Sequence, residues 1–238
     1  AAVPNCRAWD PCNAFELAVI LDHGMREMME AQRDVFHYLT LGNESYAQPS
    51  LPAGVQGDLI KGLYRYAVHS PAQAKGRVRL LGSGAILREV IAAAELLAND
   101  WGIEAEVWSA TSFSELAREA REVERFNRLH PGDAQRTSHV QTCLAGGAPV
   151  IAASDYVRAW PQLIACYVEA PFTALGTDGF GRSDTRAALR RFFEVDRAHV
   201  VLAALTALRM QGKVEAGVCA EAIARYGLDP DAAASWSA

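Results

Sequence analysis

The spacing of apolar residues along the chain predicts strands that alternate with helices. Residues 5–9 predict a short strand, and the Asp-Pro pair that follows favours the start of a helix. Apolar residues then recur at intervals of three and four from Ala14 to Met28, which predicts a helix to about Met29. The β-branched and aromatic run over residues 34–41 predicts the next strand. Such a unit is typical of the end of an α/β domain, so we expect a fragment that begins inside that domain.

A stretch rich in glycine, proline and asparagine follows over residues 42–57 and indicates a linker or an exposed loop. We therefore expect residues 1–55 to end one domain and residues 56–238 to form a second. Alternation resumes in the second part, which predicts an α/β layer domain with a mostly parallel sheet and right-handed crossovers. The expected strands are 60–66, 77–81, 104–109, 149–153 and 172–175, and the expected helices are 86–99, 116–128, 156–164, 185–193, 197–211 and 218–226.

Charge and composition exclude several classes of partner. The net charge of the 238 residues is −5, and no dense cluster of Lys and Arg is present, so nucleic acid is not expected as a partner. The most basic stretch, residues 186–191, is interpreted as a solvated helix face. No apolar run reaches the ~20 residues of a membrane span, and no signal peptide is expected, so we expect a cytoplasmic protein without a membrane partner. Five scattered cysteines without a CxxC pair predict neither disulfides nor a metal site.

Gly82-Ser83-Gly84 stands between a predicted strand and a predicted helix, as in dinucleotide-binding proteins. The dinucleotide motif needs a third glycine where Leu87 stands, and an acidic residue at the end of the next strand, where the sequence is Trp108-Ser109-Ala110. We therefore predict a tight turn without a ligand. An independent nucleotide-binding α/β module remains the more remote alternative.

The most distinctive stretch is the glycine-rich segment from residue 176 to residue 184. It is either a structural loop at the carboxyl edge of the sheet or a functional loop that touches a neighbouring domain, since ligand crevices of α/β sheets lie at that edge. Ser183 or Asp184 is expected to cap the following helix. His130 and His139 are expected to be solvated rather than general bases. The candidate interface residues of the loop are Gly176, Asp178, Gly179, Gly181, Arg182, Ser183 and Asp184.

Six groups of residues occur in a fixed order over nearly the whole chain. They are Pro4-Asn5-Cys6 with Asp10-Pro11 and Phe15-Glu16; Asn43-Glu44-Ser45-Tyr46; Leu81-Gly82-Ser83-Gly84; Thr111-Ser112-Phe113 with Glu115-Leu116-Ala117; Glu124-Arg125-Phe126-Asn127 with Leu129-His130-Pro131; and Gly176 to Asp184 with Phe193-Glu194-Val195-Asp196. Together they resemble the C-terminal part of the homodimeric-type pyruvate dehydrogenases, the decarboxylating first component of 2-oxoacid dehydrogenase complexes, within the transketolase superfamily.

The resemblance implies a fold and an activity. The fold would be a three-layer transketolase C-terminal-like domain, preceded by the last strand–helix–strand of a pyrimidine-binding domain. The parent enzyme would decarboxylate pyruvate, the product of glycolysis, with thiamine diphosphate and Mg²⁺, and would pass the acetyl group to a lipoyl group. These cofactors would be bound mainly by residues outside the chain, so the fragment alone would be inactive and mainly structural. A 2-oxobutyrate-handling relative is the alternative.

The resemblance also implies partners and a few site residues. The parent enzyme would be a homodimer that binds the dihydrolipoyl acyltransferase of the complex. Asn43, Glu44 and Tyr46 are candidates for a substrate channel, because the corresponding segment of transketolases carries a basic residue for a sugar phosphate, whereas Leu41-Gly42 stand here. The motif departs from the family at Ser45, where asparagine is commoner. No residue of the chain is expected to be catalytic, to bind the cofactor or to hold a metal.

Overall fold

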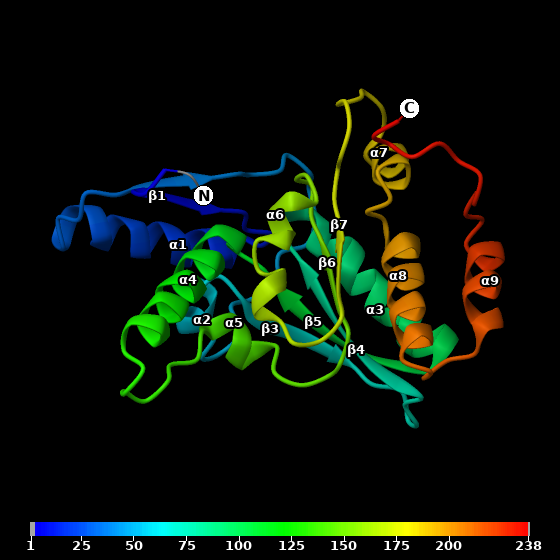
Figure 1. Cartoon of the computed structure of the whole chain (residues 1–238). Coiled ribbons are helices and arrows are strands. Elements are labelled where there is room, and N and C mark those ends of the chain that lie inside the picture. Colours follow the sequence, from blue (N-terminus) through cyan, green and yellow to red (C-terminus); the bar gives the residue numbers. More distant parts are fainter. Residues whose placement is uncertain (1–2, 238) are drawn as a thin grey trace.

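The strands form a small sheet and a large sheet in the computed structural model, which describes residues 3–237 (Figure 1). The small sheet pairs β1 with β2 in parallel, and the large sheet has the order β3-β5-β4-β6-β7. The strands are β1 (Cys6–Trp9), β2 (Phe36–Leu39), β3 (Tyr64–His69), β4 (Gly76–Gly82), β5 (Ile103–Ser109), β6 (Val150–Ala153) and β7 (Phe172–Leu175).

The first unit is the predicted strand–helix–strand. After β1, Asn13 occupies the position before helix α1 (Ala14–Met25), and a π-helical turn η1 (Arg26–Glu30) extends the helix. The side chain of Glu16 accepts the backbone N–H of Asn13 at 2.8 Å, which satisfies a donor that the helix itself leaves free. Strand β2 then returns parallel to β1, with Cys6 opposite Phe36.

The large sheet is parallel except for β3, which runs antiparallel to β5. Strand β4 pairs in parallel with β5 on one side, from Gly76 opposite Ile103 to Gly82 opposite Ser109, and with β6 on the other. All four residues of β6 are buried, as expected of a parallel strand that is covered on both faces. The predicted fold class, an α/β domain with a mostly parallel sheet, is confirmed.

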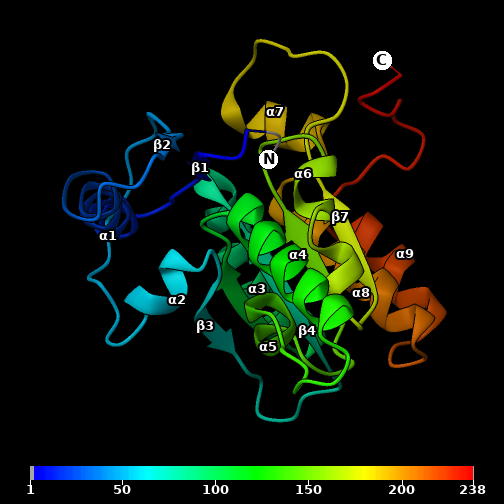
Figure 2. The same cartoon turned by 60° about the vertical axis from the view of Figure 1, so that its left-hand side comes forward.

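Helices cover both faces of the large sheet and make three layers (Figure 2). One core packs α3, α8 and α9 against the sheet, and a second core packs α4 and α5 against the other face. The remaining elements are α2 (Gln56–Ile60), η2 (Gly84–Ile86), α3 (Leu87–Trp101), α4 (Phe113–Leu129), α5 (His139–Cys143), α6 (Ala159–Gln162), η3 (Ala165–Tyr167), α7 (Arg186–Phe192), α8 (Arg197–Met210) and α9 (Ala216–Arg225).

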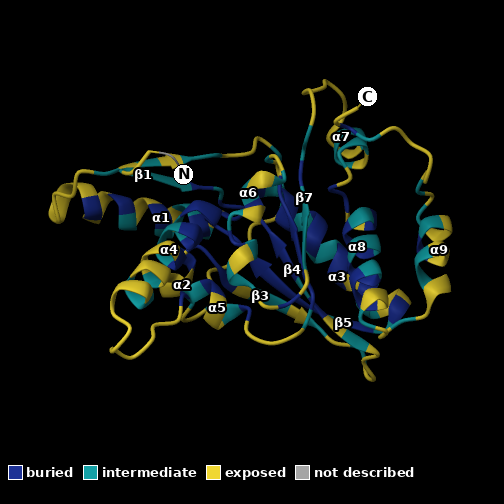
Figure 3. Ribbon diagram, viewed as in Figure 1, coloured by how far each residue is buried: buried dark blue, intermediate teal, exposed yellow. Residues whose placement is uncertain are grey.

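The burial pattern follows these layers. The central strands β4, β5 and β6 are mostly buried, whereas the outer faces of α4, α7 and α9 are exposed (Figure 3). Leu80, Val107 and Ile151 are fully buried at the middle of the sheet. Among the described residues, no helix combines the length and apolarity needed to cross a lipid bilayer.

Two predicted elements were wrong in detail, and one helix was missed. The strand predicted at 60–66 begins only at Tyr64, because α2 and a turn at Gly62 (φ +103°) precede it. The helix predicted at 156–164 is reduced to α6, because the glycine-rich loop uses the carbonyl of Tyr156 and the N–H of Arg158 as hydrogen-bond partners. Helix α5 was not predicted, although Ser138 and Gln141 form a capping box at its start.

Candidate functional site

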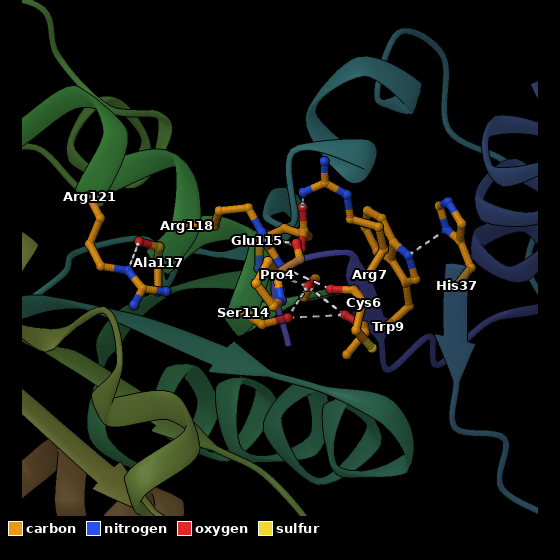
Figure 4. A network of polar contacts seen from close by, with 12 residues as sticks. Pro4, Cys6, Arg7, Trp9, His37, Ser114, Glu115, Ala117, Arg118 and Arg121 are labelled. Atoms are coloured by element: carbon orange, nitrogen blue, oxygen red, sulfur yellow. Dashed lines mark hydrogen bonds and ion pairs between the residues drawn. The ribbon is translucent and has the colours of Figure 1, made fainter. Parts of the chain in front are cut away.

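Polar contacts hold strand β1 against helix α4 (Figure 4). Arg7 of β1 forms an ion pair with Glu115 at 2.5 Å, and both side chains are largely buried. Arg118 donates hydrogen bonds to the backbone carbonyls of Pro4 and Cys6, at 2.5 and 2.8 Å. Because Arg118 bonds to main-chain atoms, it fixes the position of the β1 backbone itself. The first unit is therefore docked on the layer of α4.

A buried carboxylate, that of Glu16, joins α1 to the large sheet. One of its oxygens accepts the backbone N–H groups of Cys12 and Asn13 at 2.6 and 2.8 Å. The other accepts the hydroxyl groups of Tyr64 and Ser109, both at 2.6 Å. Burial, and then the charge of Glu16, raise the pKa of Tyr64 well above its ordinary value, so this phenol remains a donor. Four donors thus offset the cost of burying a carboxylate that has no basic partner among them.

Asp10, at the end of β1, fills the turn between β4 and α3. Its side chain accepts the hydroxyl of Thr40 at 2.6 Å, and its carbonyl accepts the N–H of Gly84 at 2.9 Å. Burial raises the pKa of Asp10 to about 6, although hydrogen bonds from Thr40 and Ser83 oppose the rise. Gly84 has φ +50°, and a Cβ there would lie 2.5 Å from the Asp10 carboxylate. The turn predicted to hold no ligand therefore holds a side chain of the first unit.

A chain of ion pairs ties the linker to α7 and α3. Arg190 contacts Glu44 of the linker at 2.7 Å and Glu89 of α3 at 3.3 Å, and Arg197 contacts Glu89 at 2.9 Å. Burial acts to raise the pKa of Glu89, but hydrogen bonds and charge from Arg197 outweigh it and lower that pKa. Arg186 and Arg191 are 51% and 45% exposed, as expected of a solvated face, but Arg190 is only 12% exposed, so the interpretation of residues 186–191 was wrong at Arg190. The carboxylate of Glu44 in the linker covers Arg190 of α7, which the local sequence does not reveal.

The other two linker candidates also make contacts within the chain. The side-chain oxygen of Asn43 accepts a hydrogen bond from Arg186. The hydroxyl of Tyr46 donates to the carbonyl of Cys12, and the guanidinium of Arg88 lies 4.1 Å from the centre of its ring. Tyr46 is half-buried against the core, so its ring supports the linker as well as facing a cavity.

Two neighbouring cavities open at the junction, where the carboxyl ends of β1, β2, β4 and β6 meet. The first, which we name the junction cavity, has a volume of about 360 Å³, and the second, the α1 cavity, of about 380 Å³. Gly42, Glu44, Ala85 and Asp155 line both. Burial raises the pKa of Asp155 above the ordinary aspartate value. Asn43 and Glu44 thus share the junction cavity with residues of the glycine-rich loop.

The glycine-rich loop, residues 176–184, lines one wall of the junction cavity through Gly179, Gly181 and Arg182. Gly176 lies against the backbone of Tyr156 and Arg158, where a Cβ would overlap main-chain atoms. A Cβ added at Gly181 would have no atom of the other described residues within 4 Å. Close approach therefore explains the glycine at position 176, while Gly181 stands in open space.

The acidic and hydroxyl residues of the loop divide in their roles. Asp178 accepts both the backbone N–H and the side-chain Nε of Arg158, at 2.9 and 2.5 Å. The prediction that Ser183 or Asp184 caps α7 was wrong. Thr185 caps the helix, because its side-chain oxygen accepts the backbone N–H of Ala188. The cap of α7 thus lies one residue after Asp184, the last residue of the loop.

The two histidines considered in the sequence lie away from both cavities. His139 contacts the carbonyl of Leu63 at 2.8 Å, and His130 contacts that of Phe126 at 2.9 Å. The sequence analysis missed the residues that bring the junction together, above all Arg190 and Glu89. The sequence offered one usable signal for Arg190. Arg186 and Arg190 stand one helical turn apart, so their side chains lie on the same face of α7.

Comparison with known proteins places this fold and junction in a family. Residues 62–196 match the family model of the transketolase-like TK C-terminal domain, more than half of the chain, so the chain belongs to that family. Residues 1–49 match the pyruvate dehydrogenase E1 component middle domain. The chain is 52% identical over 232 residues (97% of its length) to the pyruvate dehydrogenase E1 component of Cupriavidus necator, and 43% identical over 231 residues (96%) to that of Escherichia coli K12.

The chain spans 26% of the length of each of these relatives. Solved transketolases share the fold: the enzyme of Pichia stipitis, in complex with sedoheptulose-7-phosphate, is 17% identical with a TM-score of 0.59, covering 89% of this chain and 26% of that one. The transketolase of Campylobacter jejuni is 16% identical with a TM-score of 0.57, over 86% and 27%. The resemblance inferred from the sequence motifs is confirmed.

Proposed function

We propose that the chain is the C-terminal quarter of the E1 component of a cytoplasmic pyruvate dehydrogenase, which decarboxylates pyruvate and transfers the acetyl group to a lipoyl group. The observation that carries the proposal is the 52% identity to a pyruvate dehydrogenase E1 component over 97% of the chain. The two family models, which match residues 1–49 and 62–196, support a domain boundary near residue 55.

Thiamine diphosphate supplies the decarboxylation chemistry in such an enzyme, together with Mg²⁺. The described residues do not fit the metal by themselves, because no group of three or more His, Cys, Asp or Glu side chains among them is placed to hold an ion. We propose that these cofactors are bound mainly by residues outside the chain, and we assign no catalytic step to the residues present.

The role we propose for this chain is positional. Glu16 and Asp10 fasten the first unit to the large sheet, and Arg190 fastens the linker through Glu44. A small shift at such a junction displaces whatever the first unit holds, and misplacement of about 1 Å is enough to impair catalysis. Asn43, Glu44 and Tyr46 are proposed to border the path of a small substrate without a phosphate, beside the two cavities.

The surface of the glycine-rich loop is also suited to assembly with other subunits. We propose that the parent enzyme is a homodimer that binds a dihydrolipoyl acyltransferase, and that the glycine-rich loop contributes to one of these contacts. Phe180 at the tip of the loop is 87% exposed, and an exposed aromatic ring is typical of an interface. Arg182 of the loop and the ring of Phe192 lie 4.1 Å apart, so the loop base packs on α7.

The test is a chimera in which this chain replaces the matching quarter of the Cupriavidus necator relative. The chimera is expected to reduce an artificial electron acceptor when pyruvate and thiamine diphosphate are supplied. The matched control carries the corresponding region of the Campylobacter jejuni transketolase, which has the same fold at 16% identity, and is expected to be inactive. A chimera with this chain that folds and dimerises but does not turn over pyruvate would contradict the proposal.

A further inference from the structure

The chain after α9 returns along the molecule to the glycine-rich loop (Figure 1) and contacts it through Ser235 and Trp236 of the segment 234–237. Ser235 is 5% exposed, whereas its neighbours Trp236 and Ser237 are exposed. The buried residue of the segment marks a docking contact, which Ser235 makes with the backbone of Gly179.

Gly179 is shaped for this contact. Its φ is +99°, and a Cβ at this position would overlap the carbonyl group of Ser235 and lie 3.0 Å from the Cα of Trp236. Both the backbone conformation and the space therefore exclude other residues at position 179. The neighbouring surface that demands a glycine here belongs to the same chain.

Arg158 makes a second link between the segment 234–237 and the loop. Its guanidinium lies 4.3 Å from the centre of the Trp236 ring, and its Nε contacts the Asp178 carboxylate at 2.5 Å. A planar guanidinium can stack on an aromatic ring and bind a carboxylate with its edge at the same time. Arg158 is thus sandwiched between the ring of Trp236 and the loop.

The two halves of the loop are held in different ways. The first half is fixed to the sheet edge, because Thr177 donates to the carbonyls of Tyr156 and Asp155 at 2.9 and 2.5 Å. Among the described residues, the second half has no such anchor at Phe180, which is 87% exposed, or at Gly181, where a Cβ would meet no other atom within 4 Å. The contact of Gly179 with Ser235 lies between the two halves.

We propose that residues 234–237 act as a strap that holds the second half of the glycine-rich loop in place, and so sets one wall of the junction cavity. Gly179, Gly181 and Arg182 supply that wall. Release of the strap would free the loop about Gly179 and change the cavity without disturbing the large sheet. The proposal rests on contacts within this chain and holds whatever the substrate of the parent enzyme is.

Hydrogen–deuterium exchange of the 238-residue chain tests the strap. In a Trp236→Ala variant, amides of residues 178–184 are expected to exchange at least about tenfold faster, while those of β4, β5 and β6 keep their rates. Trp236 is 55% exposed, so its truncation leaves no core void and the fold is retained. The matched control, Met210→Ala, removes another exposed apolar side chain, at the far end of α8, and is expected to leave the loop rates unchanged.

A second variant tests the contact from the other partner. Gly179→Ala is expected to expel the strap, so that amides of residues 233–237 exchange as fast as an unstructured segment. Loop rates in Trp236→Ala that match the wild-type protein would overturn the proposal, as would faster exchange spread over the whole sheet. Unchanged exchange at residues 233–237 in Gly179→Ala would overturn it as well.

Discussion

The carboxylate of Glu16 accepts a hydrogen bond of 2.6 Å from the hydroxyl of Tyr64, and both residues are buried at the boundary between the first unit and the large sheet. The two residues stand 48 positions apart in the sequence. Hydrogen bonds to a charged group are the stronger kind, and a buried carboxylate that loses a donor is costly. This pair therefore holds the two parts of the chain together at one point.

Tyr64→Phe removes that donor with little change of shape. We expect the free energy of unfolding to fall by about 1.5 to 3 kcal/mol, because the buried carboxyl group of Glu16 loses one of its four hydrogen-bond donors. Urea denaturation at neutral pH measures the change. Tyr167→Phe is the control, since that hydroxyl reaches Glu124 at 3.4 Å on the surface, and a loss below about 0.5 kcal/mol is expected there. Equal effects of the two changes would contradict the role of Glu16.

The raised pKa of Asp10 predicts a dependence of stability on pH. The pKa of this carboxyl group lies near its ordinary value of 3.8 in the unfolded chain and is raised to about 6 in the folded one. Its contribution is therefore fully present below the unfolded pKa and is lost as pH rises through about 6. Relative to Asp10→Asn, the wild-type protein should lose roughly 1.4 kcal/mol of unfolding free energy between about pH 5 and about pH 7.5.

Urea denaturation of both proteins at the two pH values measures this difference. Other titrating groups, such as Glu89 with its lowered pKa, contribute equally to the two proteins and cancel. The difference in unfolding free energy between the two proteins could instead stay constant over this range, or grow in favour of the wild-type protein at higher pH. Either result would contradict the raised pKa of Asp10.

Gly84→Ala is expected to destabilise the junction. The left-handed backbone at φ +50° and the overlap with the Asp10 carboxylate together should cost at least about 2 kcal/mol of unfolding free energy. The control is Gly147→Ala, where no atom lies within 4 Å of the added Cβ, and where a change within about 0.5 kcal/mol is expected. Thermal and urea unfolding distinguish the two. A tolerated alanine at position 84 would mean that Asp10 does not fill the turn.

Arg190→Met tests the attachment of the linker. Glu44 and Glu89 lose a shared cation while remaining partly buried, so the free energy of unfolding is expected to fall by about 2 to 3 kcal/mol. Limited proteolysis should then cut faster within residues 42–50. Arg128→Met, which removes an exposed ion pair with Glu124, should change neither quantity measurably. Unaltered cleavage of the linker in Arg190→Met would contradict its attachment to α7.

Periodicity was enough to predict most of the fold. The apolar spacing of α3 and the buried run of β6 are local properties, so both elements and the parallel sheet followed from them. Elements whose limits depend on distant contacts were missed, as at Tyr156 and Arg158, where the peptide groups bind the glycine-rich loop instead of continuing a helix.

The junction was harder to predict than the fold. A charged residue on a helix, such as Glu16 or Arg190, has the same local pattern whether it faces water or a buried partner. The partners of both residues lie far away in the sequence, so only the folded chain reveals them. Gly179 was predicted as one of the interface residues of the glycine-rich loop, but the surface that requires a glycine there, the backbone of Ser235, could not be inferred from the neighbouring sequence.

The most direct test of the proposed division of labour is a calorimetric titration of the 238-residue chain with thiamine diphosphate and Mg²⁺. Because we assign cofactor binding to residues outside the chain, no saturable heat is expected, although the active chimera should bind the cofactor. Saturable binding at micromolar concentrations by this chain alone would contradict the assignment and would place the cofactor site among its own residues.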